Sequence, residues 1–332
     1  MSKLSEIELS VLDLSPVVQG SDVSQSFENS LTLARRAEEL GYKRFWLAEH
    51  HNLPGIGSSA TSVLIGYIAG GTKKIRVGSG GIMLPNHAPL IVAEQFGTLE
   101  TLYPGRIDLG LGRAPGTDPV TARALRRETK IGGMEFPELL EELRFFLSKA
   151  EPGQRVRAVP GSGLDIPIWL LGSSLYSADL AGRLGLPFSF AAHFAPDYMM
   201  HAIEIYRKVF QPSGILEKPY VMIGVSVFAA DTDVEAEKLS TSQILGFLNL
   251  IKGNPLPLGP PVDDLSKHVS ETEKAAVAER LRASMSGSPS TLKDKLNGFL
   301  SKTDADELIV NTMVYDFGAR LRSYEILSEL RK

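Results

Sequence analysis

The sequence predicts a single (β/α)₈ barrel, in which eight parallel strands close into a ring inside a ring of helices. Short runs rich in β-branched and aromatic residues alternate with longer stretches of helical period along the whole chain. There are eight such runs, and no break in composition divides the 332 residues. An open doubly wound sheet is the structural alternative.

The predicted strands are largely apolar, which is typical of parallel strands that are buried on both faces. They are Ile7–Leu12, Arg44–Ala48, Ile75–Ser79, Ile107–Leu111, Ile166–Leu171, Phe188–Ala192, Tyr220–Ala229 and Glu307–Asn311.

Helical periods lie between these strands and end at clear stop signals. The predicted helices include Ser26–Leu40, Ala88–Leu102, Pro137–Ser148 and Ser177–Leu184. Gly41, Pro104–Gly105 and Gly185 follow three of them, each just before a strand, as expected of left-handed or helix-breaking residues.

Two segments are longer than a minimal barrel requires. They are Arg113–Glu135, after the fourth strand, and Lys252–Gly287, which contains the proline-rich run 254–261. Long insertions often serve as lids or binding loops. We therefore expect residues 1–332 to form one domain, with 252–288 as an irregular, mobile lid.

Composition excludes several classes of function. The 35 Lys and Arg against 39 Asp and Glu give a net charge of −4, which predicts no nucleic-acid partner. There is no cysteine, so disulfides, thiolate metal sites and cysteine nucleophiles are excluded. No signal peptide and no run of about 18 apolar residues is present, so we expect a cytoplasmic protein without a membrane partner.

Polar and glycine residues collect where the predicted strands end, which is where barrel enzymes place their active sites. The groups are Glu49-His50-His51-Asn52, Gly78-Ser79-Gly80-Gly81, Gly110-Leu111-Gly112-Arg113, Gly172-Ser173-Ser174 with Ser177, His193 and Asn311. The strand starts carry no comparable groups.

His50 and His51 are adjacent, so on extended backbone their side chains point to opposite faces and make a poor pair of metal ligands. We expect one to face the barrel mouth as a proton-transfer group and the other to be held by the structure. The alternative is that both are hydrogen-bonded structural residues beside Glu49.

Gly172-Ser173-Ser174 opens a helix, and its amides and hydroxyls, with that of Ser177, could hold a phosphate. Arg113 at a neighbouring strand end is a natural partner for that phosphate. The alternatives are a simple helix cap and a surface arginine paired with Asp118 or Glu128.

The glycines at the third strand end, Gly80 and Gly81 among them, leave room for a flat ring against the backbone, although a tight turn would also use them. The later run from Gly110 to Gly116 has the spacing G-x-G-x-x-x-G, which is not a dinucleotide fingerprint. We therefore predict no tight NAD binding there.

These residues, in order, resemble the luciferase-like flavin monooxygenases, the bacterial luciferase family. The resemblance covers nearly the whole chain. It rests on Leu47-Ala48-Glu49-His50-His51, Val77-Gly78-Ser79-Gly80-Gly81-Ile82-Met83-Leu84-Pro85, Ala93-Glu94-Gln95 and Pro104-Gly105-Arg106-Ile107-Asp108-Leu109-Gly110-Leu111-Gly112-Arg113.

The resemblance implies a barrel enzyme, usually a dimer, that uses reduced FMN and O₂ to oxygenate a small organic substrate through a C4a-peroxyflavin. A separate NAD(P)H:flavin reductase would supply the reduced FMN. The alternatives are hydride transfer with the deazaflavin F420, which some branches use, and flavin binding without turnover. Gly112 stands where the light-emitting subunit has a cysteine, so light emission is not implied.

The resemblance also assigns roles to residues. His50 matches the catalytic histidine, and Gly80-Gly81 matches a cis peptide that lies against the flavin ring. Arg113, Ser173 and Ser177 match positions that hold the flavin phosphate. One extra residue precedes Gly185, so the choice among Ser173, Ser174 and Ser177 stays open.

The sequence leaves the substrate open, because loops shape the pocket. Apolar and aromatic residues near the strand ends could line either the pocket or the core. They are Trp46, Met83, Phe194 and Tyr315.

Overall fold

A computed structural model describes residues 3–125 and 136–332, and it confirms the closed barrel. Eight parallel strands form the ring in the order β10-β1-β2-β3-β5-β6-β7-β8, and β8 pairs with β10 to close it. They are β1 (Glu8–Asp13), β2 (Arg44–Leu47), β3 (Arg76–Ser79), β5 (Ile107–Gly112), β6 (Ile168–Gly172), β7 (Phe188–Phe190), β8 (Val221–Ala229) and β10 (Glu307–Asn311).

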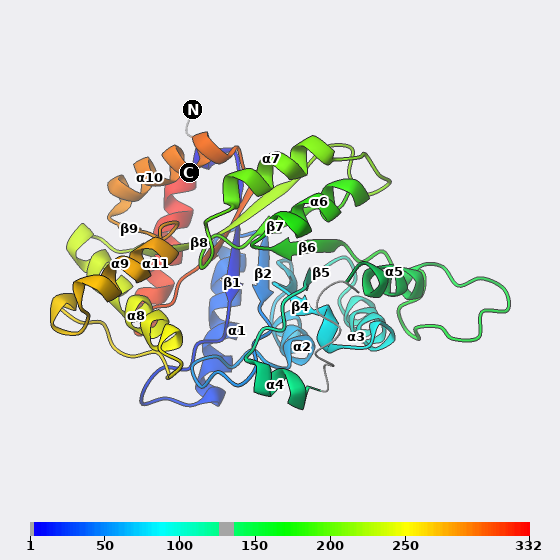
Figure 1. The fold of residues 1–332 in the computed structure, drawn as a ribbon, viewed down its shortest axis with the longest axis horizontal. Helices are drawn as coiled ribbons and strands as arrows, with labels where there is room; N and C mark the ends of the chain where they lie inside the picture. The colour runs from blue at the N-terminus through cyan, green and yellow to red at the C-terminus, as the bar shows by residue number, and fades with distance from the viewer. Residues whose placement is uncertain (1–2, 126–135) are drawn as a thin grey trace.

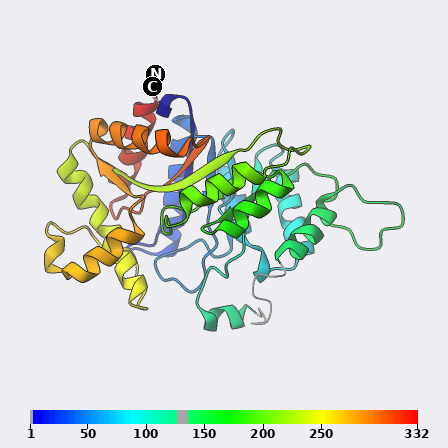
Figure 2. The ribbon, with the colours of Figure 1, turned by 45° about the horizontal axis from the view of Figure 1, so that its top comes forward.

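Helices surround the strands (Figure 1). They are α1 (Val23–Glu39), α2 (Thr61–Gly71), α3 (Pro89–Leu102), α4 (Pro119–Ala124), α5 (Phe136–Leu147), α6 (Leu175–Leu184), α7 (Met199–Val209), α8 (Asp233–Ile251), α9 (Glu271–Arg280), α10 (Pro289–Thr303) and α11 (Phe317–Arg331). Figures 1 and 2 both place α4 and α8 beyond the same end of the barrel, the end to which the strands run.

The predicted strand boundaries agree with the structure to within two residues. Gly41 and Gly185 follow α1 and α6 with φ of 78° and 62°, the left-handed conformation expected of helix stops. Two short strands were not predicted, β4 (Ile82–Met83) and β9 (Met285–Gly287), because two or three residues cannot show a periodic pattern.

Alternate strand residues point into the barrel, as the two-residue period of a strand requires. One inward layer is closed by large apolar side chains, with Trp46 and Trp169 packed edge to face at 5.2 Å between ring centres. The members of this layer are Leu12, Trp46, Ala48, Trp169, Met222 and Ile309. The layer separates the two ends of the barrel interior.

A buried network of charges fills the end where the strands begin, which we call the barrel floor. Arg44 donates to Asp108 at 2.8 Å and to Glu307 at 2.9 Å, and both carboxylates are fully buried. Arg76 donates to the other oxygen of Asp108 at 2.7 Å, and the Tyr220 hydroxyl donates to Glu307 at 2.9 Å. Every charge of this floor therefore has an opposite charge beside it.

The two insertions lie at the other end. Arg113–Glu135 contains α4, and residues 126–135 are outside the described part of the chain. The proline-rich run is irregular as expected, but the same insertion also contains α9 and β9, whose apolar residues pack against α8. Leu258 is buried and exchanges main-chain hydrogen bonds of 2.9 Å with Val17 and Gln19 of the β1–α1 loop. The mobility of residues 252–288 stays a prediction.

Within 3–125 and 136–332, none of the helices is both long enough and apolar enough to span a membrane.

Candidate functional site

The predicted site residues follow four strands that are neighbours in the ring. His50 follows β2, Gly80-Gly81 follows β3, Arg113 follows β5, and Gly172 ends β6 just before Ser173 and Ser174. Because these strands are parallel and adjacent, their carboxyl ends meet on one side of the barrel mouth. We call β2, β3, β5 and β6 the first half of the mouth, and β7, β8, β10 and β1 the second half.

His50 and His51 separate as the strand period requires. His51 Nε2 lies 2.9 Å from the Glu49 carboxylate, so His51 is the histidine held by the structure. His50 follows Trp46 and Ala48 on the inward face and is partly exposed. Burial lowers the pKa of His50 below its ordinary value, against the opposing effects of the Gly116 backbone and the Glu49 carboxylate. It is therefore neutral near pH 7 and able to accept a proton.

Glu49 fixes the backbone around His50. Its buried carboxylate accepts from the Met83 amide at 2.9 Å, from Asn86 at 3.1 Å and from His87 at 2.9 Å. Burial raises the pKa of Glu49, but the hydrogen bonds of His87 and His51 outweigh it, so the pKa lies below its ordinary value. The sequence analysis gave Glu49 no role, because three of these partners lie more than 30 residues away.

The Gly80-Gly81 peptide bond is cis, as the resemblance implied. It is bound to the end of β2 and to the segment that follows: the Gly80 amide donates to Leu47 at 2.8 Å, and the Glu49 amide donates to Gly81 at 3.2 Å. A Cβ on Gly81 would lie 2.7 Å from the Gly110 carbonyl oxygen, so a side chain does not fit there. The space that a side chain on Gly81 would need is therefore filled by the backbone of β5.

Arg113 meets the start of α6. Its guanidinium lies 4.5 Å from the ring centre of Tyr176, in the first turn of that helix. Ser174 is the N-cap residue, but its side chain makes no capping hydrogen bond. Buried Ser177 packs against Gly172, where a Cβ would lie 2.6 Å from the serine Oγ. Of the predicted alternatives for Arg113, Asp118 caps α4, and Glu128 lies outside the described residues.

His193 belongs to the second half of the mouth and had no role in the sequence analysis. It follows β7 and packs edge to face against Phe194 at 4.8 Å. Burial, and then the charge of His50, lower the pKa of His193 to about 4. The two histidines are thus near enough to interact. The available signal was its position directly after a strand.

The four residues that could line either the pocket or the core lie in different places. Trp46 is fully buried and donates to Asp108, so it belongs to the core. The Met83 sulfur lies 2.6 Å from where a Cβ on Gly112 would be, so it fills the place of that missing side chain. Phe194 is exposed beside His193, and Tyr315 donates to the Gln19 carbonyl on the rim.

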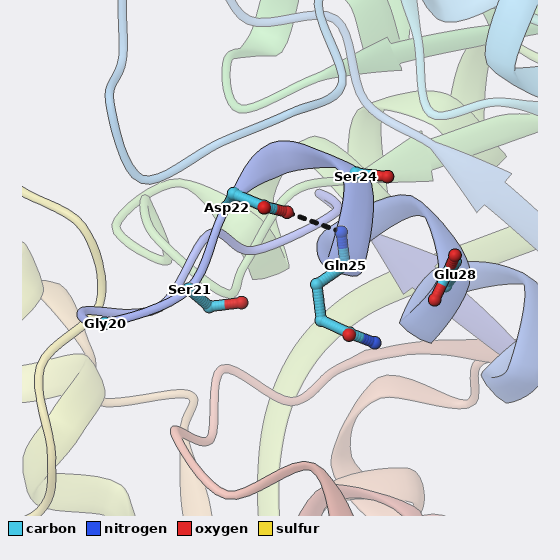
Figure 3. Close-up of a pocket in the computed structure, with 6 residues that line it drawn as sticks. All are labelled: Gly20, Ser21, Asp22, Ser24, Gln25 and Glu28. Atoms are coloured by element: carbon cyan, nitrogen blue, oxygen red, sulfur yellow. Dashed lines mark hydrogen bonds between the residues drawn. The ribbon is translucent and has the colours of Figure 1, made fainter.

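A hollow of about 480 Å³ lies at the start of α1 (Figure 3). Its polar lining includes two carboxylates, those of Asp22 and Glu28. Asp22 already accepts a hydrogen bond from the Gln25 amide, as the N-cap of the helix. None of the predicted site residues lines this hollow, so it is not part of the first half of the mouth.

The chain is similar to known proteins over nearly its full length. It is 59% identical to the uncharacterized protein YvbT of Bacillus subtilis (98% of this chain, 96% of the relative). It is 50% identical to a luciferase-like monooxygenase of Escherichia coli (98% and 97%). The crystal structure of apo-MsnO8 matches with a TM-score of 0.87 and 36% identity, over 99% of this chain and 98% of that one.

More distant structures share the fold and differ in cofactor. The oxygenating constituent of 3,6-diketocamphane monooxygenase from Pseudomonas putida, in complex with FMN, has a TM-score of 0.73 at 20% identity (99% and 97% covered). An F420-dependent secondary alcohol dehydrogenase has a TM-score of 0.68 at 14% identity (98% and 99%). The model of the luciferase-like monooxygenase family matches residues 7–308. The chain therefore belongs to the luciferase-like monooxygenase family.

Proposed function

We propose that this protein is an FMN-dependent monooxygenase that uses reduced FMN and O₂ to oxygenate a small organic substrate. The proposal rests on the combination of features in the first half of the mouth. It combines a cationic phosphate partner, a helix start without a side-chain cap, backbone free of side chains, and a neutral histidine on four neighbouring strands.

The residues present fit FMN. A phosphate at the start of α6 would accept hydrogen bonds from the backbone amides that the Ser174 side chain does not cap. The dipole of the helix also favours an anion there. Arg113 would supply the positive charge, held in place by Tyr176. Gly172, Ser173, Ser174 and Ser177 are the candidates for the remaining contacts. Gly80 and Gly81 would let the flavin ring approach the backbone.

Bound reduced FMN supplies the electrons with which O₂ is activated, so that one oxygen atom reaches the substrate. His50 would accept or return a proton at its imidazole, since its lowered pKa leaves it neutral near pH 7. Glu49 would hold His50 and the Gly80-Gly81 segment in register through the bonds described above. The lid packed on the β1–α1 loop would limit the access of water.

We further propose that a separate NAD(P)H:flavin reductase supplies the reduced FMN. Gly110 and Gly112 lie within β5 itself, and the next helix, α4, begins only at Pro119. A dinucleotide fingerprint needs these glycines in a tight turn at the start of a helix. The run is therefore explained by strand packing against Ser79 and Met83.

We also propose a homodimer formed through α2 and α3. The α2 sequence has no charged residue, yet Val63 is 73% exposed and Tyr67 lies one turn further on the same side. Ile91 and Leu102 are exposed on neighbouring α3. A helix that is apolar all round is normally buried, and a second copy would bury this face. Light scattering of the native protein and of Val63→Glu tests it, with a monomeric native protein as the contradicting result.

The test of the cofactor is an anaerobic titration of the purified protein with reduced FMN and, separately, with reduced F420. We expect saturable binding of FMN that weakens at least tenfold in Arg113→Ala. After mixing with oxygenated buffer, the absorbance of oxidised flavin should appear later than with free FMN. Binding of F420 alone, with no effect on the reaction with oxygen, would assign the protein to hydride transfer. Binding of FMN without any effect on that reaction would indicate a flavin-binding protein without turnover.

A further inference from the structure

The second half of the mouth carries polar side chains that the proposed flavin site does not use. His193 follows β7, and Ser226 lies on the inward face of β8, two residues after Gly224. Gln243 reaches Ser226 from α8. We call His193, Ser226 and Gln243 the β7–β8 polar cluster. β7 pairs with β6, so the cluster borders the proposed flavin site without sharing any of its strands.

His193 occupies space that β8 leaves open. A Cβ on Gly224 would lie 2.6 Å from His193 Nδ1, so only a glycine allows the ring this position. Nδ1 is buried and makes no hydrogen bond of good geometry with the described residues, although the Gly224 backbone lies close enough to favour the protonated ring. An unpaired buried ring nitrogen costs free energy, which a ligand that pairs with it would recover.

Gln243 presents a second unpaired group on the same wall. Its Nε2 donates to the buried Ser226 hydroxyl at 3.0 Å, while its Oε1 is buried without a partner in the described chain. Residues two apart on a strand lie about 7 Å from each other on one face. Gly224 and Ser226 therefore place the ring of His193 and the amide of Gln243 along one side of the mouth.

The chemistry of the cluster selects for a neutral ligand. None of its three residues carries a fixed charge, and His193 is neutral at pH 7 because burial lowers its pKa. The Gln243 amide offers an acceptor in the orientation described and a donor if its two ends are exchanged. A secondary amide has both a carbonyl and an N–H group, so it can pair with either orientation and with the imidazole.

We propose that the β7–β8 polar cluster is a subsite that binds an uncharged hydrogen-bonding group of the substrate, a secondary amide being the group that matches it. This inference rests on the proposed function, because only an enzyme would bind this group as part of its substrate. Its test does not depend on flavin or on turnover.

The probe is N-methylacetamide, added to the full chain with ring-labelled histidines and followed by NMR. The His193 signals are identified by their loss in His193→Gln. We expect them to shift saturably, with a dissociation constant in the millimolar range, since so small a ligand has few atoms with which to gain binding free energy. Acetate and methylammonium, which have a similar size but carry charge, should cause no saturable shift.

Two variants locate the binding. Gly224→Ala places a methyl group against the imidazole without removing a polar atom, and Gln243→Met removes the amide while keeping the length of the side chain. Each should weaken binding of N-methylacetamide at least tenfold. His201→Gln, at an exposed position on α7, is the matched control and should leave binding unchanged. Unaltered spectra of the other histidines verify that the variants are folded.

Three results would overturn the proposal: no shift of His193, equal shifts with acetate, or displacement of the amide by FMN. The last would place the cluster in the flavin site. Failure of the flavin titration with the amide shift intact would overturn the proposed cofactor alone. Normal flavin binding without an amide shift would overturn this subsite alone.

Discussion

The two ends of the barrel treat buried polar groups in opposite ways. At the floor, the Arg44 guanidinium is shared between two buried carboxylates, and Arg76 and Tyr220 complete their pairing. At the mouth, His193 Nδ1 is buried without a partner in the described chain, and the pKa values of both inward-facing histidines are lowered.

The difference separates an end whose buried polar groups are fully paired from an end whose buried polar groups can still gain hydrogen bonds. A fully paired network gains nothing from a ligand, whereas an unpaired buried group gains the full value of a hydrogen bond when one arrives. The same strands carry both ends, so substitutions only a few residues apart along a strand should have different consequences.

The largest effect should come from breaking the floor. In Asp108→Asn, Arg44 and Arg76 lose a buried carboxylate that each contacts at less than 3 Å. Removing one partner of a buried ion pair typically costs 3–5 kcal/mol. We expect the free energy of unfolding, measured by urea denaturation, to fall by about this amount. The folded variant should still bind flavin, and a loss confined to flavin binding would refute the division.

The next effect belongs to the mouth. His50→Gln should lower the rate of substrate oxygenation by about 100-fold or more, the usual contribution of a proton-transfer group. FMN affinity and unfolding free energy should stay close to those of the native protein, because His50 lies outside the proposed phosphate site at Arg113 and the start of α6. Stopped-flow kinetics and urea denaturation measure the two quantities. A native rate in His50→Gln would remove the proposed role, and His201→Gln is the matched control.

The pH dependence of stability gives a third contrast. His193 has a pKa of about 4 in the folded chain against an ordinary value of 6.5, so the unfolded chain takes up the proton first. Stability should therefore fall as the pH drops from 6.5 to about 4, by at most about 3 kcal/mol from this residue. Denaturation of the native protein and of His193→Gln across this range measures it. Parallel curves for the two proteins would contradict the expectation.

The smallest effect should come from the surface. Arg183 and Asp179 form an exposed pair one turn apart on α6, at 2.8 Å. Such pairs contribute a few tenths of a kcal/mol and are screened by salt. Asp179→Asn should change the free energy of unfolding by less than about 0.5 kcal/mol. A change in the free energy of unfolding as large as that of Asp108→Asn would show that burial of an ion pair does not determine how much its loss destabilises the protein.

Much of the fold was predictable because its signals are local. Apolar runs and glycine stops identify each strand and helix, and the ring order follows from the count of eight parallel units. The strand ends located the first half of the mouth for the same reason. The strand period also separated His50 from His51 before any contact was known.

The remainder depends on contacts between distant parts of the chain. Glu307 meets Arg44 across 263 residues, and nothing near either residue indicates the pairing. His193 acquires its unpaired nitrogen only because Gly224, on the next strand, has no side chain. The proline-rich run resembled a free loop, yet Leu258 packs on the β1–α1 loop through contacts that no local pattern shows.

That packing of Leu258 gives a way to measure the opening of the proposed lid. Its two main-chain bonds involve the amide protons of Gln19 and Leu258, and both protons lie between the lid and the rim. Amide protons exchange with solvent only when such bonds open. Their exchange therefore reports how readily the Leu258 segment separates from the β1–α1 loop, and under the proposed lid role this opening limits the passage of any molecule beneath it.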